Sequence, residues 1–154
     1  MRVRMKPDEA FAFLAASHTG ILTTLRRDGT PIALPVWFAA KDLRIYVATP
    51  AKTKKVLRIR NDDRVSFLTE SGERWAELKA VHVTGRARLV EDPALIDAVG
   101  GLLDEKYAAF RTTRRSMPKT AQRHYSGGRA VIEILPDERV LSWDNAKLKL
   151  EPTA

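Results

Sequence analysis

The segment from Ala80 to Val90 alternates apolar and polar side chains along its whole length. Its odd-numbered positions carry Val81, Val83, Ala87 and Leu89, and its even-numbered positions carry His82, Thr84, Arg86 and Arg88. Successive side chains of a β-strand point to opposite faces, so this period of two predicts a strand with one buried and one solvated face. Such strands favour antiparallel pairing over a parallel α/β sheet. Gly85 at the centre predicts a bulge or a sharp barrel bend.

Turn signals divide much of the remaining chain into further short strands. We expect these strands at residues 20–25, 32–39, 43–48, 64–69, 129–135 and 139–143, the first two joined by a hairpin turn at Asp28-Gly29. Helices are expected from Pro7, from about Lys52 to Asn61, and from Pro93, with Asp92 as the N-cap. This order predicts a mainly β fold, an antiparallel split β-barrel with helices packed on it. We expect one domain over residues 1–154, since no repeat or linker separates its parts.

The composition excludes several kinds of chemistry. With no cysteine the chain has neither disulfides, thiolate metal sites nor a cysteine nucleophile. Its three histidines lack metal-ligand spacing, and its serines lack a nucleophile elbow, so we predict no metal site and no catalytic side chain. A formal net charge of +8 implies an acidic partner, which could be nucleic acid, an anionic membrane surface or a phosphorylated cofactor.

The N-terminal region predicts a cytoplasmic protein. Asp8 and Glu9 stand where the apolar core of a signal peptide would begin, and they suit the first turn of an amphipathic helix instead. No apolar run approaches the ~20 residues that cross a bilayer, so we expect no membrane partner.

Basic residues crowd the expected start of the helix that follows the strand at 43–48. Helix N-termini carry partial positive charge and unpaired N–H groups, so cations there are unfavourable unless an anion lies among them. The hydroxyl of Thr53 and the charges of Lys54, Lys55 and Arg58 could hold a phosphate. The alternative, a basic helix face that simply contacts water, stays open.

Two further features suggest a binding cleft. Trp37 and Phe38 are adjacent on an expected strand, so one ring can pack in the core while the other lines a cleft for a flat heterocycle; two core aromatics are the alternative. The segment from Arg111 to Arg129 is basic and contains no acid. It could contact a polyanionic tail, a substrate carboxylate or nucleic acid, or be a loosely ordered basic loop.

The order of several motifs resembles that of a known superfamily. These motifs are Thr23-Thr-Leu-Arg-Arg-Asp-Gly-Thr-Pro-Ile, Pro35-Val-Trp-Phe, Ile45-Tyr-Val-Ala-Thr, residues 54–67 from Lys54-Lys55 to Val-Ser-Phe, and Val83-Thr-Gly-Arg-Ala-Arg-Leu. Together they resemble the pyridoxamine 5′-phosphate oxidase-like, FMN-binding split β-barrels, over roughly residues 8–92. The chain looks more similar to the flavin- and deazaflavin-dependent oxidoreductases than to true pyridoxamine-phosphate oxidases, whose C-terminal substrate signature is missing.

The resemblance implies a homodimer with two sites at the subunit interface, each holding FMN or the deazaflavin coenzyme F-420. It implies that Thr53, Lys54 and Lys55 hold the cofactor phosphate, and that the ring lies along Val36-Trp37 and Ala48-Thr49. Trp75 and Trp143 could reach the partner subunit's site. F-420 carries a phosphodiester and a polyglutamate tail, so the excess of Lys and Arg favours F-420 over FMN.

The expected function is hydride transfer between this cofactor and an unsaturated small molecule. The cofactor carries that chemistry, so no catalytic side chain is required. Three alternatives stay open. They are an FMN-dependent pyridoxamine-phosphate-oxidase-like enzyme, a non-catalytic flavin or haem binder, and a nucleic-acid-binding barrel, which the shortage of aromatic side chains in the basic segment disfavours.

Overall fold

The computed structural model describes residues 3–151. Its helices are α1 (Pro7–Ala16), α2 (Lys54–Asn61), α3 (Pro93–Tyr107) and α4 (Lys119–Ser126). Its strands are β1 (Gly20–Leu25), β2 (Pro31–Val36), β3 (Ala39–Lys41), β4 (Arg44–Pro50), β5 (Arg64–Ser71), β6 (Lys79–Leu89), β7 (Arg129–Pro136) and β8 (Leu141–Asp144). Four short 3₁₀ helices are η1 (Trp75–Glu77), η2 (Ala108–Phe110), η3 (Arg114–Ser116) and η4 (Asn145–Lys147).

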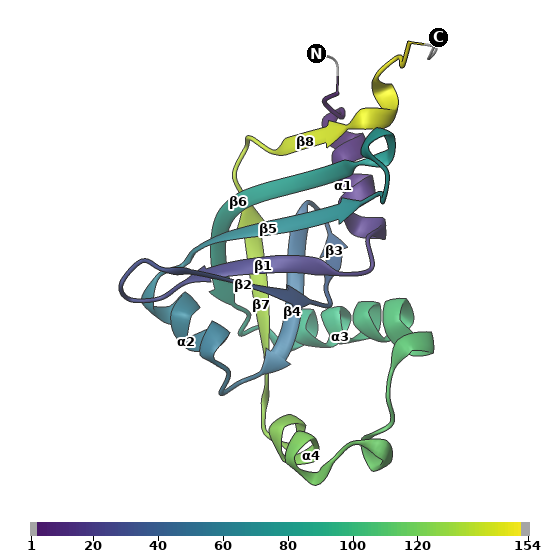
Figure 1. Cartoon of the computed structure of the whole chain (residues 1–154). Coiled ribbons are helices and arrows are strands. Elements are labelled where there is room, and N and C mark those ends of the chain that lie inside the picture. The colour runs from purple at the N-terminus through teal and green to yellow at the C-terminus, as the bar shows by residue number, and fades with distance from the viewer. Residues whose placement is uncertain (1–2, 152–154) are drawn as a thin grey trace.

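The eight strands form one curled antiparallel sheet (Figure 1). The strand order is β2-β1-β5-β6-β7-β4-β3, and β8 pairs with β6 beside this path. This confirms the predicted split β-barrel with packed helices. None of the helices within residues 3–151 is long and apolar enough to span a membrane.

Strand β6 explains how the barrel splits. It pairs with β5 from Lys79 to Arg86, while on its other edge it pairs with β8 at one end and with β7 at the other. Gly85 lies where the pairing with β7 begins, and a Cβ there would lie 2.2 Å from the carbonyl oxygen of Leu135. Close strand packing therefore requires glycine at this position. The alternation predicted for β6 is confirmed, because Val81, Val83 and Ala87 are buried.

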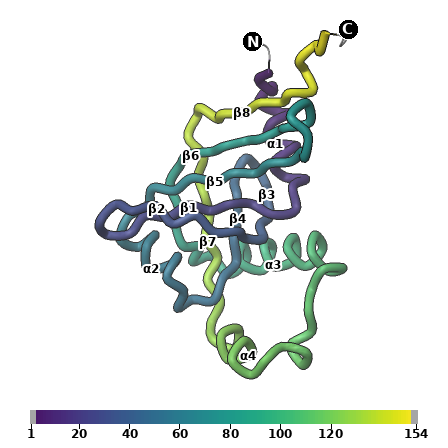
Figure 2. The backbone as a smooth tube through the Cα atoms, in the orientation of Figure 1, coloured from purple at the N-terminus to yellow at the C-terminus, as the bar shows by residue number. Residues whose placement is uncertain are grey.

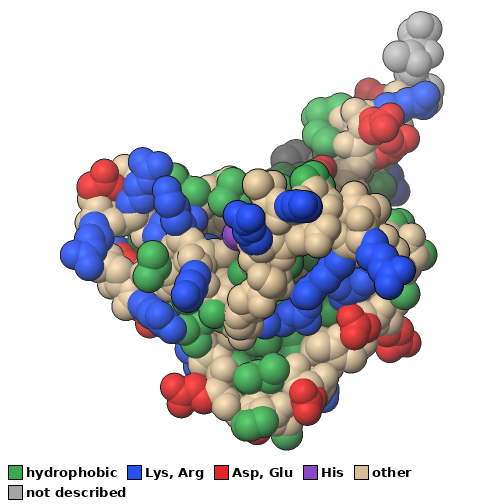
Figure 3. Space-filling model, turned by 90° about the horizontal axis from the view of Figure 1, so that it is seen from below, with side chains coloured by type: hydrophobic (Ala, Val, Ile, Leu, Met, Phe, Trp, Pro, Cys, Tyr) green, Lys and Arg blue, Asp and Glu red, His purple; other side chains and the backbone are tan. Residues whose placement is uncertain are grey.

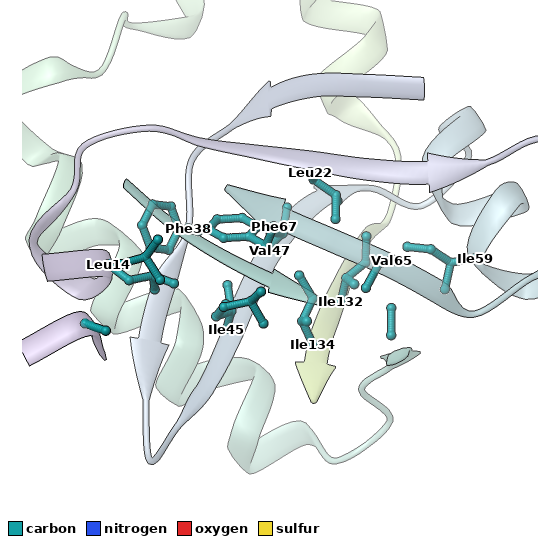
Figure 4. Close-up of a cluster of buried hydrophobic side chains, with 14 of the residues drawn as sticks. Leu14, Leu22, Phe38, Ile45, Val47, Ile59, Val65, Phe67, Ile132 and Ile134 are labelled. Atoms are coloured by element: carbon teal, nitrogen blue, oxygen red, sulfur yellow. The ribbon is translucent and has the colours of Figure 1, made fainter. Parts of the chain in front are cut away.

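The core lies inside the curl of the sheet (Figure 4). The rings of Phe38 and Phe67 meet edge to face, with their centroids 4.8 Å apart. Around them pack aliphatic side chains of several strands and of helices α1 and α2, including Leu14, Leu22, Ile45, Val47, Ile59, Val65, Ile132 and Ile134. A second cluster forms where α3 covers the sheet, and it includes Val99, Leu103, Tyr107, Tyr46 and Val131.

One expectation about an element was wrong. The strand predicted at 32–39 ends at Val36, and a separate strand begins at Ala39, because the backbone of Phe38 bonds side chains instead of a neighbouring strand. Its N–H donates to Tyr107 Oη (3.0 Å), and its carbonyl accepts from Lys106 Nζ (3.1 Å). For the basic segment after α3, the alternative of a loosely ordered loop does not hold, since the segment contains helix α4.

We call residues 108–128, which connect α3 to β7, the strap. The strap extends away from the barrel, on the side opposite the two ends of the described chain (Figure 2). None of its residues is buried. Its two ends are fixed, because α3 packs on the sheet and Gly128 O accepts a hydrogen bond from Ala51 N (2.7 Å).

Candidate functional site

A cavity of about 700 Å³ lies between the barrel, the end of α3 and the strap. The barrel contributes Pro35, Val36, Trp37, Val47, Ala48, Thr49, Pro50 and Lys55. Helix α3 and η2 contribute Leu103, Tyr107 and Phe110, and the remaining wall comes from Arg111, Thr112, Arg114, Met117, His124, Tyr125, Gly127, Gly128 and Arg129. A volume of this size lies within the range of ligand sites, roughly 300–1,000 Å³.

The polar end of the barrel wall is built by the turn from β4 into α2. Thr49 is the next-to-last residue of β4 and Thr53 precedes α2, and their hydroxyl oxygens lie 3.3 Å apart. Lys55 Nζ donates to Thr49 Oγ1 at 3.4 Å, a long hydrogen bond. Partial burial, and secondarily the charge of Arg58, lower the pKa of Lys55. An ammonium group so placed would be stabilised by a bound anion.

Arg58 points from α2 toward the barrel beside this turn. Its Nε donates to Thr24 Oγ1 at 2.7 Å, and burial lowers its pKa. Within residues 3–151, neither Lys55 nor Arg58 forms an ion pair with a carboxylate. Two neighbouring cations without an acidic partner are what a phosphate site requires.

The structure brings together five of the eight predicted binding residues. Those that line the cavity are Val36, Trp37, Ala48, Thr49 and Lys55. Thr53 contacts Thr49, and Arg58 lies one turn from Lys55 but does not line the cavity. Lys54 is exposed and also lies outside the lining, because consecutive helical residues point in different directions.

The apolar wall is held by Tyr107, the last residue of α3, for which the sequence carried no functional signal. Its ring stacks on Trp37 with centroids 4.4 Å apart and planes 2° apart. Its hydroxyl donates to His18 O at 2.7 Å, and burial raises its pKa. Trp37 keeps 37% of its surface exposed and lines the cavity while Phe38 has none exposed, so of the two alternatives the structure shows one ring in the cleft and one in the core.

The wall on the strap side is basic. Among the described residues, 3–151, no Asp or Glu lines the cavity. Arg114 Nη2 donates to Tyr125 O at 2.9 Å and so joins the two halves of the strap. In Figure 3, Lys and Arg side chains gather around the hollow next to the strap, while most acidic side chains lie nearer the edges of this face. Of the three histidines, His124 alone lines the cavity.

The family pattern described as pyridoxamine 5′-phosphate oxidase matches residues 7–142. The chain belongs to the pyridoxamine 5′-phosphate oxidase family. Membership confirms the resemblance stated from the sequence motifs. The match extends well beyond the motifs themselves, since it includes the strap and ends within β8.

Several relatives within or near this family are similar to the chain. The F420H(2)-dependent biliverdin reductase of Mycobacterium tuberculosis (strain CDC 1551 / Oshkosh) is 34% identical over 137 residues, 87% of this chain and 85% of the relative. A crystal structure of a conserved hypothetical protein from Mycobacterium tuberculosis is 34% identical, with a TM-score of 0.80 over 99% of this chain and 92% of that one. An FAD-binding protein of Mesorhizobium loti shares the fold at 24% identity, with a TM-score of 0.69 over 92% of this chain and 96% of that one.

Proposed function

We propose that this chain is an oxidoreductase that binds F-420 or FMN in the cavity and transfers hydride to an unsaturated small molecule. The observation that carries the proposal is the group of Thr49, Thr53, Lys55 and Arg58, whose two cations have no carboxylate partner within residues 3–151. The family and the name of the 34% identical reductase support the class of reaction.

The residues present fit such a cofactor. Lys55 and the two threonine hydroxyls would hold its phosphate, with Arg58 adding charge one helical turn away. Lys54 would add charge only from outside the cavity. Val36, Trp37 and Ala48 offer an apolar surface for a flat ring, which suits the largely apolar lining of cofactor pockets.

When bound, the cofactor would supply or accept the hydride. The chain's own residues would bind the cofactor, orient it and exclude water from it. Tyr107 stacks behind Trp37 and fixes the position of the apolar wall, while the strap covers the cavity from the opposite side. We assign no catalytic side chain.

F-420 is favoured over FMN. The name of the biliverdin reductase specifies F420H(2), and this relative is 34% identical over 87% of the chain. The net charge of +8 and the absence of any acid from the cavity lining suit a cofactor with several negative charges.

We also propose that two copies of the chain form a homodimer. Strand β2 lies at one end of the strand order, and Leu34 on it is 44% exposed. An open apolar edge is a surface that proteins normally cover. Sedimentation measurements would show a dimer, and a monomer at all concentrations would contradict this. The cytoplasmic location stays a prediction.

Replacement of Lys55 tests the phosphate end of the site. Lys55→Ala removes the cation that α2 contributes to the cavity lining, and we expect it to weaken binding of F-420 and FMN by about tenfold or more, since hydrogen bonds to charged groups contribute about 1.5–3 kcal/mol. Arg60→Ala is the matched control, because Arg60 is exposed on the same helix. Fluorescence titration would measure both dissociation constants.

Equal affinity in the Lys55→Ala and Arg60→Ala proteins would contradict the phosphate assignment. If cofactor binding is absent altogether, haem becomes the next ligand to test, with His124 as the histidine that reaches the cavity.

A further inference from the structure

The strap wall carries more positive charge than one cofactor phosphate explains. Lys55 serves the barrel end of the cavity, whereas the wall made by the strap and by the adjoining first residue of β7 carries Arg111, Arg114 and Arg129 together with His124. Among residues 3–151 no carboxylate lines the cavity, and of the three arginines only Arg111 pairs with an acid outside it, Asp104. Since like charges repel, such a wall is best explained by a second anion bound within reach of the strap.

The three arginines differ in the contacts that their side chains already make within the protein. Arg111 pairs with Asp104 at 2.7 Å, and Arg114 donates to the carbonyl of Tyr125 at 2.9 Å. The side chain of Arg129 makes no hydrogen bond or ion pair with residues 3–151, although Asp97 and Asp104 line a neighbouring groove that it also borders. Arg129 therefore keeps all its donors available for a ligand.

The position of Arg129 is fixed by the sheet. It is the first residue of β7 and lies opposite Pro50 of β4, in the ladder that also carries Ala48 and Thr49. A side chain on a paired strand is held more firmly than one on the strap. Arg129 thus joins the barrel wall, where we place the cofactor ring, to the strap wall.

Aromatic surface lies beside these cations. Phe110 is 58% exposed and Tyr125 is 48% exposed, and both line the cavity with Met117 between them in sequence. Large rings left accessible around a basic rim suit a ligand with a flat conjugated body and acidic groups at its edge. A conjugated body is also what hydride acceptance requires.

We propose that the strap wall is the acceptor subsite and that it selects conjugated acceptors carrying carboxylates, with Arg129 as the main contact and Arg114 as the second. This inference rests on the proposed function. Arginine suits the task because its planar fork can donate two parallel hydrogen bonds to one carboxylate.

A matched pair of probes tests the proposal without turnover. Biliverdin and its dimethyl ester share one conjugated body and differ in two carboxylates. We expect the protein to bind biliverdin at least about tenfold more tightly than the ester, as charge-assisted hydrogen bonds predict. Quenching of tryptophan fluorescence would follow both titrations, and Trp37 lies in the cavity to report them.

Arginine variants show which side chain causes the preference for biliverdin over its ester. Arg129→Ala should reduce the preference for biliverdin over its ester to about twofold or less, and Arg129→Lys should keep part of it, because charge remains but the fork is lost. Arg115→Ala is the control, since Arg115 is exposed on the strap but does not line the cavity. The control should keep the full preference.

Three results would overturn the proposal. They are equal affinity for biliverdin and its ester, no binding of either, and the same loss of preference in Arg115→Ala as in Arg129→Ala. A titration with cofactor tests the other possible source of carboxylates, which is the glutamate tail of F-420. If Arg129→Ala weakens glutamate-tailed F-420 but not the tail-free form, and leaves the preference for biliverdin unchanged, the wall binds the cofactor tail instead. A failure of the proposed function itself would be recognised by a different result, because the wild-type protein would then bind neither F-420 nor FMN.

Discussion

Lys106 is held by backbone groups and an aromatic ring instead of an acid. Its Nζ donates to the carbonyls of Ala15 (3.3 Å) and Phe38 (3.1 Å) and lies 3.7 Å from the centroid of the Phe38 ring. It thereby joins α1, α3 and the connection between β2 and β3, directly below the wall formed by Trp37. Burial lowers its pKa to about 8, from a usual value of 10.5.

This pKa predicts a pH-dependent contribution to stability. The folded-state value lies below the unfolded one, so between about 8 and 10.5 the unfolded chain binds more protons. The free energy of unfolding should therefore rise with pH across this window. Lys106→Met removes the titrating group. The free energy of unfolding of the wild type should therefore rise relative to that of the variant as the pH rises through this window. Urea unfolding at several pH values measures this, and parallel curves for the two proteins would contradict it.

At the scale of elements, the close contact between β6 and β7 depends on Gly85. A Cβ at this position would meet the Leu135 carbonyl oxygen at 2.2 Å, and backbone cannot move aside as a side chain can. We expect Gly85→Val to lower the free energy of unfolding by about 1–3 kcal/mol, the usual cost of overpacking. Denaturant unfolding would measure it.

Gly101 provides the control for this prediction. It is exposed on α3, and a Cβ there would meet nothing within 4 Å. Gly101→Ala should raise stability by up to about 1 kcal/mol, because alanine favours the helix. Equal effects of the two substitutions would show that strand packing at Gly85 is not the cause.

The sequence predicted most elements because their patterns are local. Alternation placed β6, and Asp92 with Pro93 placed the start of α3, where Asp92 Oδ1 accepts from Ala94 N. The break at Phe38 could not be predicted, since its backbone partners come from Tyr107, which lies 69 residues further along the chain. Helix α4 was missed because it is only eight residues long and Ala121 and Tyr125 are its only apolar residues, too few to show a helical period.

Part of the candidate site could be predicted from the sequence and part could not. Thr49, Thr53 and Lys55 are near neighbours in sequence, so one turn brings them together. Tyr107 and Arg129 reach the cavity only through the packing of α3 and the pairing of β7 with β4. The different directions of Lys54, Lys55 and Arg58 follow from helix geometry once the helix start is known.

At the scale of the whole molecule, the cavity exists because three distant parts of the chain meet. The barrel offers a phosphate end and an apolar wall, α3 supports that wall from behind, and the strap adds a basic wall. Two separate basic regions with an apolar wall between them suit a protein that holds a cofactor and a second molecule together. That the chain is a single domain stays a prediction.

The measurement that tests this account most directly is a pair of fluorescence titrations of purified wild-type protein, one with F-420 and one with FMN. The account predicts saturable binding of F-420 at micromolar concentration, tighter than that of FMN. Tighter binding of FMN would point to a flavin enzyme and overturn the choice of cofactor. Binding of neither would contradict the central claim that this cavity holds a flavin-type cofactor.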